Sequence, residues 1–290
     1  MDAHWDDLKT VMVLVQRQSL AEAAKVLGIS YTTVARRVSR LEGHLGVGLF
    51  VRQSDGYRPT EAGILVAQHA EQMQMAEHEL MRGLTARDQT LKGDLTITAP
   101  QLMIAHVFAP VLADFQTAHP DVALHVRATN DVLDLTRREA DLAIRVSRAP
   151  GDSLMGVRLA EQDTASFATQ PWADRHLADR NAPLDWIVYA THKSLPEQVM
   201  KQAPGSRISF RFDDMVAMAG AAQAGLGVAR MPMFLGRALP GLVQLPILPP
   251  QPYADIWVVA HPDVWPSARV TAFRDILVPY MKRKRAEFVG

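Results

Sequence analysis

Cysteine is absent from all 290 positions of the sequence. This absence excludes disulfide bonds, thiol nucleophiles, zinc sites with thiolate ligands and thiol-based redox sensors. No apolar run approaches the roughly 18 residues that a membrane-spanning helix needs. Residues 1–7 are acidic, whereas a secretory signal would begin with basic residues and continue with apolar ones. We therefore expect a soluble cytoplasmic protein. Its length of 290 residues suits two domains, and its hydrophobic content of 48% supplies material for their cores.

Enzyme signatures are missing as well. The sequence has no Gly-x-Ser-x-Gly, no Gly-x-Gly-x-x-Gly, no Walker loop and no His-Glu-x-x-His motif. The segment 224–228 contains a glycine turn without phosphate-binding spacing, and it is interpreted as a helix-to-strand connection. The ten histidines are scattered, and His69 and His78 do not have the spacing of metal ligands. We therefore expect no enzymatic activity, no catalytic residue, no metal and no cofactor.

The net charge of the whole chain does not indicate a nucleic-acid partner, because its 31 basic and 31 acidic side chains cancel. Locally the balance is different. Residues 9–60 hold eight basic and three acidic side chains, so the remainder of the chain is slightly acidic. A basic head on a neutral body is typical of a protein that binds DNA and has a second activity elsewhere.

The basic head contains the signals of a helix-turn-helix. A helical pattern runs over residues 6–18, and Ser19-Leu20-Ala21-Glu22 is a capping box that opens a short helix over 20–27. Gly28 ends that helix, and Ser30 caps a third helix over 31–45. Two helices joined by a short turn that contains glycine are typical of this motif.

The third helix has two different faces. Val34, Val38, Leu41 and Leu45 follow helical spacing and are expected to be buried. Short polar residues and arginines lie on the other faces, as in a helix that reads the major groove. The alternative is an ordinary solvated basic face, which the capping box and the turn disfavour. The expected DNA contacts on this helix are Ser30, Tyr31, Thr32, Thr33, Arg36, Arg37 and Arg40.

Residues 47–60 predict a β-hairpin wing. Residues 49–51 form the first strand, Ser54-Asp55-Gly56 the turn and 57–59 the return. Arg52 and Arg58 flank the turn, where a wing meets phosphates or the minor groove. The head is therefore expected to be a winged helix-turn-helix over residues 1–60.

A set of residues in the head and at its junction with the next helix follows a known family pattern in order and spacing: Ala23-Ala24, Leu27-Gly28-Ile29-Ser30, Val34, Leu41-Glu42, Leu45-Gly46, Leu49-Phe50, Arg52 and Pro59-Thr60-Glu61-Ala62-Gly63. With these residues the sequence resembles the LysR-type transcriptional regulators. Leu20 and Ala35 depart from the pattern, since the family usually has an aromatic residue at the first position and often a serine at the second. The resemblance covers essentially the whole chain and implies DNA, a small-molecule effector and a second copy of the chain as partners, with RNA polymerase as a further candidate.

Residues 61–90 predict a long linker helix, opened by Thr60 as its cap. A heptad seam that Glu77 interrupts favours dimerisation, and the resemblance implies pairing through this helix and frequent assembly into tetramers. The alternative is a helix that packs only on its own domain. The expected dimerisation residues are Val66, Met73, Leu80 and Leu84.

Strands and helices alternate after residue 91, which predicts α/β architecture. Among them are a strand over 142–146, a helix over 131–139 and a late strand over 256–260. Two sets of elements favour two lobes with a cleft between them, as in periplasmic binding proteins. We expect an effector domain over 91–290, with lobe one at 91–162 and 266–290 and lobe two at 163–265.

Ligands of such sheets bind beyond the carboxyl ends of the strands. Amides at a helix start, hydroxyls and an arginine in this position predict a small organic anion as the effector. Thr129 and Asn130 could instead be a simple helix cap, and Arg145 could pair with a surface acid. The expected effector contacts are Thr98, Pro100, Gln101, Thr129, Asn130, Arg145 and Thr191.

The basic run at residues 282–285 has two interpretations, a second nucleic-acid contact or, more often, a solvated helix end. The competing class for the whole chain is a small-molecule-binding protein or enzyme whose head only mediates protein contacts.

Overall fold

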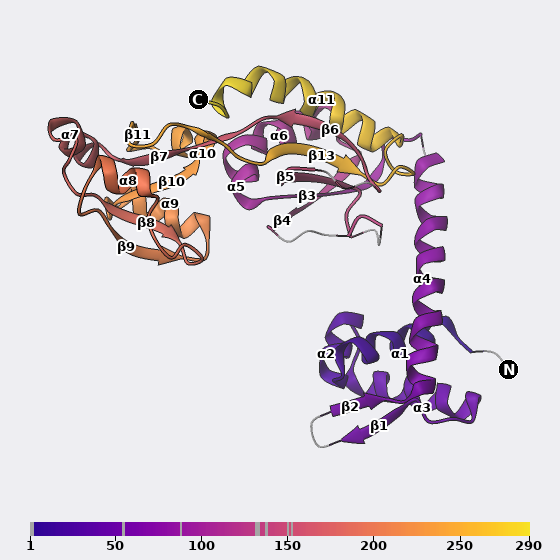
Figure 1. The fold of residues 1–290 in the computed structure, drawn as a ribbon. Helices are drawn as coiled ribbons and strands as arrows, with labels where there is room; N and C mark the ends of the chain where they lie inside the picture. Colours follow the sequence, from indigo (N-terminus) through magenta and orange to yellow (C-terminus); the bar gives the residue numbers. More distant parts are fainter. Residues whose placement is uncertain are drawn as a thin grey trace. The chain divides into compact units, whose positions relative to one another are not determined.

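A computed structural model describes residues 3–53, 56–87, 89–130, 134–136, 139–149, 151 and 153–290 of the chain. It divides into two compact units, Met1–Leu84 and Thr85–Gly290 (Figure 1). Within the described residues, no helix combines the length and the apolar character that crossing a membrane requires.

The N-terminal unit begins with three helices, as the capping signals predict. The hydroxyl of Ser19 accepts a hydrogen bond from the Glu22 amide at 3.5 Å, and that of Ser30 accepts from the Thr33 amide at 3.2 Å. Gly28 and Gly46 end their helices at φ of 66° and 67°, a conformation that glycine adopts without steric cost. The helices are α1 (Trp5–Arg17), α2 (Leu20–Leu27) and α3 (Tyr31–Leu45).

The buried stripe of α3 is shorter than the spacing predicts. Val34, Val38 and Leu41 are buried in the core that the three helices share. Leu45 is 43% exposed, so its predicted burial is wrong. It is the last residue of α3, and the chain turns away at Gly46 before this side chain reaches the core.

The wing consists of β1 (Phe50–Gln53) and β2 (Gly56–Pro59), which pair antiparallel. Its predicted turn includes Ser54 and Asp55, which lie outside the described residues. The carboxylate of Glu42 accepts hydrogen bonds from the amides of Leu49 and Phe50 at 2.7 and 3.3 Å, which ties the wing to α3. A second tie joins the wing to the end of α1, where the Tyr57 amide donates to the carbonyl of Gln18 at 3.0 Å.

Helix α4 (Glu61–Arg87) follows the wing directly. The hydroxyl of Thr60 caps it by accepting from the Gly63 amide at 3.1 Å and donates to the Gly48 carbonyl at 2.9 Å. A Cβ on Gly63 would lie 2.2 Å from the carbonyl oxygen of Leu49, so only glycine allows this close approach.

The C-terminal unit contains two mixed sheets, each the centre of one lobe. The first has the order β4-β3-β5-β13-β6, and the second has the order β11-β7-β10-β8-β9 with β12 paired to β7. The strands of the first lobe are β3 (Gly93–Ala99), β4 (Val122–Ala128), β5 (Leu142–Ser147), β6 (Met155–Ala160) and β13 (Asp255–Ala260). The strands of the second lobe are β7 (Asp163–Thr169), β8 (Asp185–Tyr189), β9 (Arg207–Phe212), β10 (Val228–Pro232), β11 (Leu242–Leu245) and β12 (Gln251–Pro252).

Helices cover both sheets. In the first lobe a helical run continues without a break from residue 101 to 118, with a π-helical segment in its middle. It packs against the long C-terminal helix, and the rings of Phe115 and Phe273 meet at 5.3 Å (Figure 1). The helical segments are α5 (Gln101–Met103), η1 (Ile104–Phe108), α6 (Ala109–Ala118), α7 (Gln170–Ala178), α8 (Glu197–Gln202), α9 (Met215–Gln223), α10 (Met233–Ala238), α11 (Ala268–Lys284) and η2 (Arg285–Glu287).

Two predictions for this unit are wrong. Strand β13 was expected in the second lobe, yet it pairs with β5 and β6 of the first, so the chain returns to the first lobe by residue 255 rather than 266. Its apolar pattern marks a buried strand but cannot say which sheet the strand joins. The expected helix over 131–139 is not helical in its described residues, 134–136 and 139, which form turns and bends. Asp134 makes its own local turn there, since its carboxylate accepts from the Thr136 amide at 2.8 Å.

Candidate functional site

The outer face of α3 is polar and exposed at its start. Tyr31 is 62% exposed, and Thr32 and Arg36 are also exposed. The Ser30 hydroxyl lies 2.8 Å from those of Thr32 and Thr33, so three hydroxyls cluster at the helix N-terminus. Arg36 forms no ion pair with another described residue. This face therefore presents hydroxyl groups followed by a cation that can contact another molecule.

Arg37 and Arg40, two further predicted DNA contacts, form ion pairs within the chain. Arg37 pairs with Asp6 at 2.7 Å, and the Arg40 guanidinium forms two hydrogen bonds with Asp7, one of them at 2.7 Å. Asp7 is completely buried, and its hydrogen bond raises the pKa of Arg40. Both arginines thus hold α3 against α1. Because both guanidinium groups are engaged within the chain, we do not include these two residues in the DNA-contact set proposed below.

The two wing arginines are exposed, but they lie on opposite faces of the hairpin. Arg52 is opposite Tyr57, and Arg58 is opposite Val51 in the register. Because successive residues of a strand alternate between faces, Arg52 shares its face with Tyr57 and Arg58 shares the other with Val51. The wing can therefore present a cation on each of its sides.

Helix α4 is divided along its length. Ala67 and Ala70 are buried in the core of the N-terminal unit, and Val66 is partly buried against that core. Farther along, Met73, Leu80 and Leu84 are 46%, 63% and 52% exposed, although they are apolar. The first part of the helix packs within its own chain, and the second part leaves its apolar side chains uncovered.

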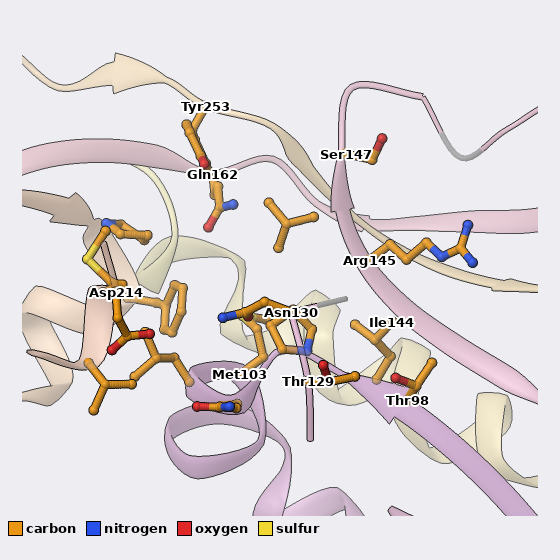
Figure 2. Close-up of a pocket in the computed structure, with 18 of the residues that line it drawn as sticks. Thr98, Met103, Thr129, Asn130, Ile144, Arg145, Ser147, Gln162, Asp214 and Tyr253 are labelled. Carbon is orange, nitrogen blue, oxygen red and sulfur yellow. The ribbon is translucent and has the colours of Figure 1, made fainter. Parts of the chain in front are cut away.

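A cavity of about 540 Å³ lies between the two lobes of the C-terminal unit (Figure 2). In the first lobe, β3 runs parallel to β4 and β5, so the carboxyl ends of the three strands meet at one edge beside the start of α5. The second lobe contributes the end of β8, the start of α9 and the segment from β10 into α10. The lining residues are Thr98, Pro100, Gln101, Leu102, Met103, Thr129, Asn130, Ile144, Arg145, Val146, Ser147, Ala149, Gln162, Tyr189, Asp213, Asp214, Met215, Val216, Pro232, Phe234 and Tyr253.

The strand-end rule places most of the predicted effector residues correctly at this cavity. Thr191 is different, since it lies exposed in the turn after β8 and is not part of the lining. Residues that do line the cavity are Thr98, Pro100, Gln101, Thr129, Asn130 and Arg145.

Thr98 and Arg145 also interact with other residues of the protein. Thr98 is 4% exposed, and its hydroxyl donates to the carbonyl of Arg127 on the neighbouring strand at 3.2 Å. Burial lowers the pKa of Arg145, whereas the charge of Asp134 raises it. Thr98 therefore also stabilises strand pairing, and Arg145 lies in the field of a carboxylate.

The second lobe supplies residues that the sequence prediction missed. Asp214 caps α9 by accepting from the Ala217 amide at 3.0 Å. Tyr189 is half-buried, and burial raises its pKa, with further contributions from Tyr253 and Asp214. The sequence does carry a signal for Asp214, because an aspartate that precedes an alanine-rich helix is a typical N-cap at a strand-to-helix junction. Nothing in the sequence indicated that Gln162 and Tyr253, on the connections between the lobes, meet there.

Within the described residues, no group of three histidine, aspartate or glutamate side chains is arranged to hold a metal ion.

Two family models match the chain. The model described as "Bacterial regulatory helix-turn-helix protein, lysR family" matches residues 5–64. The model described as "LysR substrate binding domain" matches residues 88–282. The first contains the polar face of α3 and the second contains all residues of the cavity.

Similar proteins are described as transcription regulators. The Mau operon transcriptional activator of Paracoccus denitrificans is 28% identical over 264 residues, which cover 89% of this chain and 90% of that protein. An HTH-type transcriptional regulator of Haemophilus influenzae, described as uncharacterized, is 30% identical over 250 residues and covers 81% of this chain and 85% of its own.

Solved structures share the fold over the full length. The Vibrio cholerae virulence activator AphB, described as a member of the LTTR protein family, matches with a TM-score of 0.59 at 21% identity over 96% of this chain and 99% of that one. LysG of Corynebacterium glutamicum, solved with bound effector Arg, has a TM-score of 0.52 at 20% identity over 97% and 98%. At these identities the likeness concerns the fold.

Proposed function

Because this chain belongs to the LysR-type family of transcription regulators, we propose that a small organic anion in the cavity between its lobes controls its binding to DNA. Family membership establishes a DNA-binding regulator with a substrate-binding domain, and its relatives are transcription regulators rather than enzymes. The observation that carries the proposal is the meeting of three strand ends and a helix start at one cavity.

The first-lobe wall offers groups that suit an anion. Amides at the start of the helical run 101–118 have no partner one turn earlier, and they favour negative charge. Thr129 and Asn130 follow β4 beside them, and Arg145 extends from β5. Hydroxyl, amide and guanidinium donors in one wall would hold a carboxylate through charge-assisted hydrogen bonds.

The N-terminal unit would read the operator with α3 in the major groove. The hydroxyls at the helix start reach base edges, and Arg36 reaches a guanine or a phosphate farther along. The wing arginines contact the backbone on its two sides. The proposed DNA contacts are Ser30, Tyr31, Thr32, Thr33, Arg36, Arg52 and Arg58.

The uncovered part of α4 would pair with a second copy of the chain. Met73, Leu80 and Leu84 are exposed apolar residues on a helix that links two units. Pairing removes them from water and presents two DNA-binding heads to a two-fold symmetric operator. We assign residues 1–60 to DNA binding, 61–90 to dimerisation and 91–290 to effector binding. We further propose that the chain forms a dimer or a tetramer and acts in the cytoplasm. RNA polymerase is proposed as a further partner.

Binding to DNA upstream of the chain's own gene tests the function. We expect operator affinity that falls linearly with the logarithm of salt concentration, and an effector from a thermal-shift screen that changes this affinity. A protein whose head mediates only protein contacts would show no salt-dependent preference for that DNA over unrelated DNA. Such a result would reject this DNA as the operator. The ligand screen would then give information about the effector site alone.

A further inference from the structure

One end of the cavity is rich in groups that accept hydrogen bonds and attract cations. The carboxylates of Asp213 and Asp214 lie at the start of α9, and the phenol rings of Tyr189 and Tyr253 line the same region. Burial raises the pKa of Tyr189, and Tyr253 and Asp214 add to this increase. No lysine or arginine of the second lobe is part of the described lining. This end therefore has the opposite polarity from the wall that carries Arg145.

Gln162 adds an independent sign of a ligand. Its side chain is 2% exposed and lines the cavity, and its amide nitrogen donates to the carbonyl of Ala254 at 2.9 Å. That bond fixes which way the amide faces and leaves the oxygen, Oε1, without a partner among the described residues. A buried acceptor without a donor destabilises the folded protein, because it has lost its hydrogen bonds to water. A ligand that donates a hydrogen bond there would remove this destabilisation.

Figure 2 shows how the two polarities are separated. Gln162, Tyr253 and Asp214 lie on one side of the cavity, and Arg145 and Ser147 lie on the other. Gln162 projects toward the middle of the cavity, whereas Arg145 extends away from Asp214. Apolar side chains such as Met103 and Ile144 line the space between them. A ligand that carries charge of only one sign would interact favourably with only one side of the cavity.

We propose that the effector carries a protonated amino group bound at the side of Gln162 and Asp214, in addition to its carboxylate. An ammonium group donates three hydrogen bonds, which suits the unpaired amide oxygen of Gln162 and the carboxylate of Asp214 on the same side of the cavity. The aromatic rings of Tyr189 and Tyr253 add cation–π attraction. The effector class is therefore the amino acids, with an apolar segment across the middle. This inference rests on the proposed function, because it assigns the second end of the same ligand.

Matched compounds test the inference on the full-length protein. The probes are the common amino acids, each with its deamino carboxylic acid and its decarboxylated amine, measured by thermal shift and then by calorimetry. We expect an amino acid that binds about tenfold or more tighter than its deamino partner, because charge-assisted hydrogen bonds are lost with the amine. Deamino acids that bind equally well would overturn the inference and leave the proposed anion site intact. Binding by neither class would overturn both.

Two variants locate the amine. Asp214→Asn removes the charge and keeps a side chain that caps a helix, and Gln162→Met removes the acceptor at nearly constant volume. Each variant should bind the amino acid about tenfold more weakly than the wild type does and should bind the deamino acid with unchanged affinity. Asp174→Asn on the exposed face of α7 removes a charge outside the cavity and is the control. Equal affinity of the amino acid for wild type and both cavity variants would place its amine elsewhere.

Discussion

Two arginines of α3 that lie four positions apart have different surroundings. Arg36 is exposed and has no ion-pair partner among the described residues, whereas Arg40 pairs with the buried carboxylate of Asp7. Arg36→Ala should weaken operator binding by roughly 1–3 kcal/mol and relax the preference at one base pair. The melting temperature of this variant should remain that of the wild type, because the side chain of Arg36 forms no ion pair with the residues that the structure describes.

Arg40→Ala is the matched control and should behave in the opposite way. Removal of the guanidinium leaves Asp7 as a buried carboxylate without its cation, which should destabilise the folded protein. Thermal unfolding would show a lower midpoint, with operator affinity preserved below it. If the Arg40→Ala protein were as stable as the wild type but had lost its operator affinity, Arg40 would be a DNA contact.

His176 gives the second lobe a predicted dependence on pH. It is buried, and burial lowers its pKa below the usual value of about 6.5, with a further decrease from Arg180. The unfolded chain therefore binds a proton at a higher pH than the folded one. Stability is fully present above the unfolded pKa and falls as pH decreases from about 6.5 toward the folded pKa, by at most about 1.4 kcal/mol per pH unit. Chemical denaturation between pH 7.5 and 5.5 measures this slope, and His176→Leu should reduce it. An unchanged slope would assign the dependence to other groups.

At the scale of elements, local signals predict the head better than the body. Ser19, Ser30 and two glycines define α2 and α3 to the residue, because caps act within one turn. Strand pairing has no such local signal, as Ile256 of β13 pairs with Val146 far earlier in the chain. The lack of local signals also limits how much of the cavity could be predicted from the sequence. The ends of β3, β4 and β5 could be predicted from the strand-end rule, whereas Gln162 joins the cavity only through the path of the connections between lobes.

The uncovered segment of α4 leads to a prediction about assembly. Met73→Glu combined with Leu80→Glu should convert the dimer into a monomer, because burial of two carboxylates in an apolar seam costs several kcal/mol. Sedimentation velocity measures the change, and Gln72→Glu at an exposed polar position of α4 is the control for added charge. A dimer that persists in the double variant would mean that the copies meet through another surface.

At the scale of the whole molecule, the proposed function requires a coupling free energy between effector binding and DNA binding. A ligand changes operator affinity only as far as it binds the two arrangements of the regulator unequally, and DNA must change ligand affinity by the same factor. Thr129→Val removes a cavity hydroxyl, so we expect roughly tenfold weaker effector binding with unliganded operator affinity unchanged. The effector concentration that gives half of the operator response should rise by the same factor. Thr191→Val makes an identical chemical change in an exposed turn outside the cavity and should match the wild type. If titrations followed by DNA anisotropy show the same midpoint for Thr129→Val and Thr191→Val, the regulating ligand binds at another place on the molecule.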